Sequence, residues 1–207
     1  MSRLTSAQWC EVLVKCEVKP ATAAKWSVIF ASVIGLGTFS QGRDEVDNWL
    51  GQVLHESMLL ERLEENLYYK TPGRLMAVWP SRFHSFEEEL PYLRNPEGLA
   101  NKVYGGRMGN VNPGDGYRYR GSGLIQVTGA DNFLAMQEAT GIPVFDCPEL
   151  LRQPTAESLQ VTIAWWEKNI PDRIMGDIVR VTKTVNGGLA GLAERQRLTG
   201  EADEALA

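Results

Sequence analysis

The chain contains 207 residues, of which 43% are hydrophobic and 23% are charged. This ordinary globular composition excludes a disordered, collagenous or fibrous chain. Acidic residues outnumber basic ones, 26 against 21, for a net charge of −5, and the missing basic footprint argues against binding to nucleic acid or to a membrane surface.

The first third of the chain is predicted to be helical, over residues 6–16, 21–34 and 44–64. The uncharged run at residues 26–42 is shorter than the roughly 20 apolar residues that a membrane span needs. We therefore predict a buried core helix there and no membrane anchor. The N-terminus lacks the basic start and apolar run of a secretory signal, which favours a soluble cytoplasmic product.

The middle of the chain has a different pattern, because residues 70–129 contain ten glycines and five prolines. Such a composition predicts loops with short elements. Residues 116–129 are the best strand candidate: Ile125 and Val127 would share one face of an extended chain, opposite Gln126. We expect a small β-hairpin in this segment.

The last third returns to a helical pattern, over residues 155–169, 172–185 and 189–198. The tail at residues 201–207 is expected to fray. No repeat and no linker divides the chain, and its length suits one domain, or at most two small lobes with a shared core. The prediction is a single, mainly α domain over residues 1–207.

Cysteine and histidine are scarce, with three and two residues respectively. An odd number of cysteines without a C-x-x-C spacing argues against a disulfide scaffold and favours a reduced compartment. These residues do not form a zinc-ligand pattern either. We expect neither a metal nor an organic cofactor.

One glutamate falls within an apolar row of the third predicted helix. At about 100° per residue, Glu56 lies in the same narrow arc as Trp49, Val53, Leu60 and Leu63. Charged residues are normally excluded from such a row. Desolvation favours the protonated form of a carboxylic acid, which can then serve as a general acid. A buried glutamate that pairs with an arginine for structure alone fits the pattern equally well.

A second carboxylate follows at Glu64 or Glu65. On an unbroken helix Glu65 would lie about 13.5 Å from Glu56 along the axis and half a turn around it. The helix must therefore end before or near Glu65 if the two groups cooperate, and the Pro72–Gly73 pair allows such an ending. A separation of roughly 6.5 to 9.5 Å would suit an inverting glycosidase. Spacing alone does not choose between Glu64 and Glu65.

Four motifs occur in order along the chain: His55-Glu56-Ser57, Glu65-Asn-Leu-Tyr-Tyr69, Tyr104-Gly-Gly-Arg-Met-Gly-Asn110, and the glycine-rich residues 114–129. Together they resemble glycoside hydrolase family 19, which holds plant-type chitinases and phage endolysins. The resemblance runs from about residue 44 to residue 195. The Tyr-Arg-Tyr-Arg-Gly sequence at residues 117–121 is most similar to the bacteriophage and prophage endolysin branch.

The resemblance implies an α+β lysozyme-like, mostly helical fold of two lobes with a central substrate cleft. It implies hydrolysis of a β-1,4 bond between N-acetylated sugars, with inversion. Glu56 matches the general acid, Glu65 the general base, and Thr128 the hydroxyl residue that helps hold the attacking water. The implied substrate-binding residues are Gln126, Tyr119 as a cleft aromatic, Asn132, Asn186, and Arg195 as a buried arginine that steers the carboxylates.

The chain departs from the family pattern at two points. Ser122 stands where phage members often carry an arginine, which would change contacts with the glycan or its peptide stem. The disulfides of the plant members cannot be reproduced as a set by Cys10, Cys16 and Cys147. The second departure supports an intracellular bacterial or phage product.

These features predict a peptidoglycan-degrading endolysin that acts as a monomer on glycan strands. Residues 44–200 would form the catalytic core, completed by the helices of residues 1–43, with no separate cell-wall-binding domain. Made in the host bacterial cytoplasm, it would act in the periplasm and cell wall after release by a pore-forming holin or an injection apparatus. Three alternatives stay open: a chitinase with the same mechanism, a lytic transglycosylase, and a non-catalytic glycan-binding protein.

Overall fold

The structure is a computed structural model that describes residues 3–207, apart from the side chains of residues 43 and 44. It divides into two compact units. Unit 1 comprises the chain up to Leu63 together with Gly123–Ile125 and Glu149–Ala207, and unit 2 comprises Glu64–Ser122 and Gln126–Pro148.

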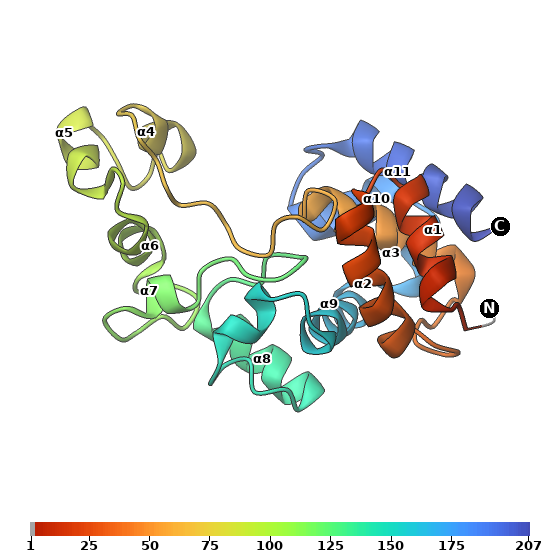
Figure 1. Cartoon of the computed structure of the whole chain (residues 1–207). Helices are drawn as coiled ribbons and strands as arrows, with labels where there is room; N and C mark the ends of the chain where they lie inside the picture. The colour runs from red at the N-terminus through yellow and green to blue at the C-terminus, as the bar shows by residue number, and fades with distance from the viewer. Residues whose placement is uncertain (1–2) are drawn as a thin grey trace. The chain divides into compact units, whose positions relative to one another are not determined.

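Unit 1 is built from helices that come from both ends of the chain (Figure 1). α11 packs against both α3 and α1, so the C-terminus closes over the N-terminal helices. Its elements are α1 (Ser6–Lys15), α2 (Pro20–Val33), α3 (Arg43–Glu56), α9 (Ala156–Asn169), η3 (Asp172–Ile174), α10 (Ile178–Asn186) and α11 (Leu192–Leu206). The 3-10 segment η2 (Pro148–Arg152) leads into this unit.

Local signals explain where several of these helices begin. Thr5 and Gln8 form a reciprocal capping box at the start of α1. Pro20 occupies the first turn of α2, where a missing N–H costs nothing. The Thr155 side chain accepts from the backbone N–H of Ser158 and so caps α9.

The core of unit 1 is aromatic. Phe30 of α2 lies 5.2 Å from Trp9 of α1 and 5.7 Å from Trp49 of α3, measured between ring centroids. These three side chains are fully buried, as is Trp166 of α9. Edge-to-face and tilted rings of this kind add to the stabilisation from burial, and they fix α3 at the centre of the unit.

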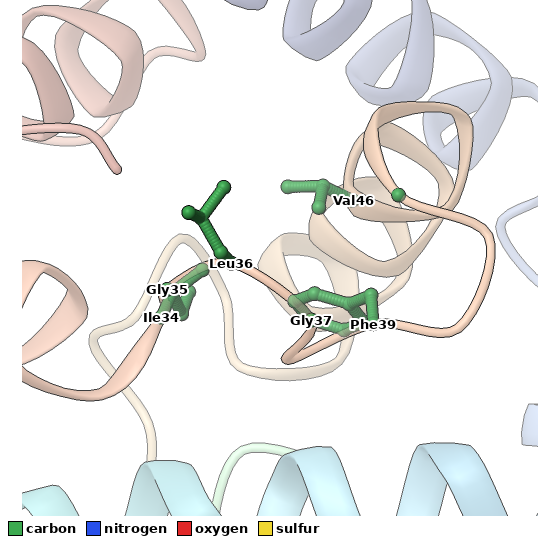
Figure 2. A pocket seen from close by; sticks show the side chains of 7 residues that line it. Ile34, Gly35, Leu36, Gly37, Phe39 and Val46 are labelled. Atoms are coloured by element: carbon green, nitrogen blue, oxygen red, sulfur yellow. The ribbon is translucent and has the colours of Figure 1, made fainter. Parts of the chain in front are cut away.

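Figure 2 shows a small pocket in the connection between α2 and α3. Apolar or glycine residues line it throughout: Ile34, Gly35, Leu36, Gly37, Phe39, Gly42 and Val46. The lining offers no acid, base or hydroxyl side chain, so this pocket is not the candidate active site.

Unit 2 carries short helices joined by long loops. A separate apolar cluster holds α4, α6 and the loops around them together, formed by Leu67, Leu75, Phe83, Leu99, Ala100 and Val103. The elements are α4 (Arg74–Val78), α5 (Phe86–Glu89), η1 (Leu90–Tyr92), α6 (Pro96–Tyr104), α7 (Asp115–Arg118) and α8 (Ala130–Thr140). The fully buried Glu89 carboxylate accepts from the backbone N–H groups of Gly73 and Met76, which stabilises the start of α4.

The mainly α class is confirmed, but the expected β-hairpin is much reduced. In residues 3–207 the pairing amounts to two isolated antiparallel bridges, Ser122 with Val127 and Glu64 with Ser122. α7 ends at Arg118, inside the predicted strand. Left-handed backbone at Gly123 and Gln126, with φ of +83° and +54°, breaks the alternation that the sequence pattern suggested.

α3 ends at Glu56, about two turns before the expected boundary at residue 64. The Ser57 hydroxyl donates to the carbonyl of Val53 at 2.7 Å and accepts from the N–H of Leu60 at 2.9 Å. The three residues from Met58 to Leu60 adopt positive φ, which a right-handed helix cannot contain. Leu60 is still buried in the core, so packing holds this left-handed turn.

Two C-terminal predictions need correction. The expected helix at residues 172–185 is interrupted between η3 and α10, because Asp177 caps α10 by accepting from the N–H groups of Val179 and Arg180. The tail 201–207 is not frayed: α11 continues to Leu206. Leu198 and Ala202, one turn apart, are fully buried and anchor that end.

Candidate active site

Glu56 is the last residue of α3, and its side chain is 18% exposed. It forms an ion pair with Arg195 of α11, and the Arg195 side chain is fully buried. Arg195 also donates to Oε1 of Gln52 at 2.5 Å and to the carbonyl of Ala190 at 3.2 Å. The glutamate–arginine pair that the sequence pattern left as a structural alternative is therefore present in unit 1.

The pair continues into a buried polar chain. Gln52 lies one turn before Glu56 on α3 and is fully buried, and its Nε2 donates to Oγ1 of Thr182 on α10 at 3.2 Å. Buried polar groups are costly unless they are hydrogen-bonded. This chain satisfies them across α3, α10 and α11, and it holds the Glu56 carboxylate from its buried side.

A close backbone approach fixes the end of α3 against the start of α11. His55 Nδ1 lies 2.7 Å from Oε2 of Glu194. Gly191 has a φ of +72°, and a Cβ atom added there would lie 2.1 Å from Cε1 of His55. Only glycine fits, because any side chain would displace the residue next to Glu56.

Gly191→Ala is expected to lower the free energy of unfolding by about 2 kcal/mol or more, from left-handed strain plus overlap with His55. Urea unfolding of this variant and of Gly187→Ala would measure the effect. Gly187 also has positive φ, of +76°, but a Cβ there meets nothing within 4 Å, so its variant carries the backbone strain alone. Equal losses in the two variants would refute the close approach.

Glu65 lies in unit 2, in a loop that follows the bridge at Glu64. Its Oε1 accepts from the backbone N–H of Gly121 at 2.5 Å, and its Oε2 accepts from the hydroxyl of Tyr104 at 2.8 Å. Burial raises the pKa of Glu65, against the opposing effects of these two hydrogen bonds and of the Arg120 charge.

The structure distinguishes the two glutamates that spacing left open. Glu64 is 44% exposed and is paired with Arg120, whose Nε donates to it at 2.5 Å. The Arg120 guanidinium is buried, lies 4.0 Å from the centre of the Tyr117 ring and donates to the Tyr117 carbonyl. Glu64 is thus neutralised by its own arginine, and Glu65 is the desolvated carboxylate of the two.

Both glutamates line an open pocket of about 190 Å³ within unit 2. Its walls combine charged groups with aromatic and apolar surface, from Glu64, Glu65, Asn66, Leu67, Tyr68, Pro96, Tyr117 and Arg120. Such a mixture suits a ligand that has both hydroxyl groups and apolar faces, as a sugar ring does.

Gln126 lies next to this carboxylate, and Thr128 and Asn132 follow it along the chain. A Cβ atom at Gly121 would lie 2.8 Å from Oε1 of Gln126 and 3.3 Å from Cβ of Glu65, so both side chains lie against the same glycine. The Thr128 hydroxyl donates to the Gln126 carbonyl at 3.0 Å, and Asn132 donates to the Thr128 carbonyl at 2.7 Å. Unit 2 therefore brings Glu65 and Gln126 together, with Thr128 close along the chain.

Tyr119 has different surroundings from those expected of a cleft aromatic, whereas Arg195 is buried beside a carboxylate, as the resemblance implied. Tyr119 is 4% exposed, and its ring stacks on Phe145 at 5.1 Å and packs against Phe133. Arg195 is fully buried and engaged by Glu56. Neither side chain presents a surface to a sugar, so Tyr119 acts in packing and Arg195 acts on the carboxylate. Asn186 ends α10 and is exposed.

Sequence reasoning missed three residues around the glutamates: Tyr104, which donates to Glu65, Gln52, which accepts from Arg195, and Arg120, which pairs with Glu64. Tyr104 begins one of the recognised motifs, but no charge pattern links it to Glu65. Among the side chains that the structure describes, which exclude those of residues 43 and 44, no three His, Cys, Asp or Glu are arranged to hold a metal ion. Within the same residues, no helix combines the length and apolarity that a membrane span requires.

The chain is similar to known proteins in sequence and in fold. Over 155 residues, 72% of this chain and 74% of the relative, it is 34% identical to a "Glycosyl hydrolase family 19 domain-containing protein" of Haemophilus influenzae. Its fold is similar to that of chitinase C from Streptomyces griseus, with a TM-score of 0.56 and 17% identity, over 98% of this chain and 76% of that chain. No family model matches the chain.

Proposed function

Because this chain belongs to glycosyl hydrolase family 19, and is thus a glycosidase of the chitinase and lysozyme type, we propose that it cuts the glycan strands of bacterial peptidoglycan. The bond cut is a β-1,4 link between N-acetylated sugars, and the anomeric configuration is inverted. Both steps of proton transfer are carried out by glutamates, without a metal or an organic cofactor.

The observation that carries this proposal is the setting of Glu65. Its carboxylate is desolvated, lines the pocket of unit 2 and has a hydrogen bond to each oxygen. A base with a raised pKa accepts a proton from water more readily than an exposed carboxylate does. Glu65 is the general base in this account, and Thr128 and Gln126 help to place the water and the sugar.

Glu56 is the general acid that protonates the glycosidic oxygen. Its ion pair with Arg195 fixes one carboxyl oxygen, Oε1. In residues 3–207 the other oxygen, Oε2, has no hydrogen-bond partner, which leaves it available to a substrate. Asn132 and Asn186 supply amide contacts to the glycan. The mechanism requires room for one water between Glu65 and the anomeric carbon.

Peptidoglycan is the proposed substrate because the Tyr-Arg-Tyr-Arg-Gly sequence at residues 117–121 resembles the phage and prophage branch of the family. In that role the protein is an endolysin, made in the host cytoplasm as a monomer and released to the periplasm through a holin pore or an injection apparatus. Chitin is the alternative within the same chemistry, and the fold similarity to a chitinase keeps it in consideration. A lytic transglycosylase usually uses one catalytic glutamate. The second, partly buried carboxylate, Glu65, with a hydrogen bond to each of its oxygens, argues against that reaction.

The test is mass spectrometry of the soluble products from purified Gram-negative peptidoglycan, with heat-inactivated protein as the control. Reducing muropeptides are expected, and the terminal sugar identifies the bond. Anhydro sugars would overturn hydrolysis in favour of a transglycosylase. Release of chitin oligomers with intact peptidoglycan would retain the mechanism and replace the substrate. If the protein binds both glycans and releases no product from either, it is a glycan-binding protein and not an enzyme.

A further inference from the structure

We propose that Tyr104 is a positioning residue for the reaction: its hydroxyl holds Oε2 of Glu65 and keeps that carboxyl in the ionised form that can accept a proton. The proposal rests on the assignment of Glu65 as general base. It adds a residue that acts through the base and not on the substrate.

The fold delivers the Tyr104 hydroxyl to Glu65 by way of α6. Asn95 caps this helix by accepting from the N–H of Gly98 at 3.0 Å. The buried face of the helix anchors it in the apolar cluster of unit 2, and the Tyr104 ring packs against the same cluster. The helix ends at Tyr104, whose carbonyl accepts from Nδ2 of Asn110 at 3.1 Å. Both the backbone and the ring of Tyr104 are therefore fixed before its hydroxyl meets the carboxylate.

Each oxygen of Glu65 has one fixed donor. The backbone N–H of Gly121 holds Oε1, and the hydroxyl of Tyr104 holds Oε2 at 2.8 Å. The Gly121 contact needs glycine, because a Cβ there would crowd Glu65 and Gln126. Tyr104 is thus the side chain that binds this carboxylate directly, and the carboxyl plane is fixed by the two donors together. A base held in one orientation needs no rearrangement when the water arrives.

The charged and titratable groups around this contact are few. Those that act on Glu65 are Arg120, which lowers its pKa, and Glu64, which raises it. Tyr69 and Arg107 act on Tyr104. Burial and the Glu65 charge raise the pKa of Tyr104, so the phenol keeps its proton and remains a donor. Because Arg120 is already paired with Glu64, the phenol hydrogen bond is the main side-chain support for the ionised carboxyl.

Tyr104→Phe removes this hydrogen bond and keeps the ring that packs in the cluster. The titration of Glu65 is expected to move upward by about one pH unit or more, since a hydrogen bond to the charged form is lost. The acidic limb of the kcat/KM profile is expected to move in the same direction. Carbon-13 NMR of the glutamate carboxyls gives the titration directly, with the Glu65 signal assigned by its loss in Glu65→Gln.

Tyr69→Phe is the matched control. Tyr69 lies close enough to Glu65 to be affected by its charge, with no hydrogen bond to it in the described part of the chain. This variant is expected to shift neither readout. If Tyr104→Phe moves the Glu65 titration no more than Tyr69→Phe does, Tyr104 does not hold the base and the proposal is wrong.

The two readouts separate this proposal from the assignment on which it rests. A shifted NMR titration with an unshifted acidic limb would show that Tyr104 holds Glu65 but that Glu65 is not the base, which overturns the positioning role. If the wild-type chain cleaves neither glycan, the proposed function fails by itself. The NMR titration would then still report whether the Tyr104 contact controls the ionisation of Glu65.

Discussion

Glu56→Gln is expected to lower kcat by about a thousandfold or more, because glutamine cannot donate a proton to the leaving oxygen. The shape of the side chain is kept, and its amide oxygen can still accept from Arg195. We therefore expect a folded protein with near-normal circular dichroism and little loss of glycan binding. The measurement is the initial rate of muropeptide release, together with a binding assay on insoluble peptidoglycan.

Glu61→Gln is the control for the same chemical change. Glu61 also lies in unit 1, five residues further on, but it forms surface contacts with Thr22 and Lys19. Its replacement is expected to leave the rate within about twofold, because exposed pairs contribute little. A Glu56→Gln protein that retains most of the wild-type rate would contradict the assignment of the general acid.

Arg195→Met is expected to lower the free energy of unfolding by about 3 to 5 kcal/mol, the usual cost of removing one partner from a buried ion pair. The change leaves Glu56 and Gln52 without the donor that holds them. Without Arg195 the Glu56 carboxyl is no longer held in one orientation. The rate per folded molecule is therefore also expected to fall. Chemical denaturation and the rate per folded molecule measure the two effects separately.

Arg197→Met provides the comparison on the same helix. Arg197 is exposed and pairs with Glu17 at 2.9 Å and with Glu201 at 2.5 Å, so its loss is expected to cost within about 1 kcal/mol. The double variant Glu56→Gln/Arg195→Met should be less destabilised than the sum of its single changes, since it leaves no buried unpaired charge. Additive losses would show that the two side chains are not coupled.

The sequence predicted the parts of the fold that depend on local chemistry. α1, α2 and α9 lie within about one residue of the predicted ranges, because Thr5, Pro20 and Thr155 act on the turns that follow them. The end of α3 was not predictable in this way. Its left-handed turn from Met58 to Leu60 exists because Leu60 is packed in the core, and that contact is tertiary.

The segment at residues 116–129 shows a similar limit. The alternation of side chains was real in the sequence, yet Gly123 and Gln126 take positive φ, which only the packed structure requires. The tail was expected to fray because it ends the chain, whereas the burial of Leu198 and Ala202 depends on α11 packing against α1 and α3.

For the candidate site, the two glutamates were found from an apolar row and from motif resemblance, and the structure gives each a set of partners. Those partners are distant in sequence: Tyr104 lies 39 residues from Glu65, and Arg195 lies 139 residues from Glu56. No periodicity can reveal such pairs. Tyr119 was assigned from its motif position, which does not report burial, and the structure encloses its ring between Phe133 and Phe145.

The most direct test of the central claim is proton NMR of the reducing ends during the first minutes of digestion. An acid–base pair that activates a water on the opposite face inverts the anomeric carbon, so a β-linked glycan must first yield the α anomer. The account predicts an initial excess of α anomer that later relaxes toward equilibrium, and its absence in Glu56→Gln. An initial excess of β anomer, or the formation of anhydro ends, would contradict catalysis by Glu56 and Glu65 as acid and base.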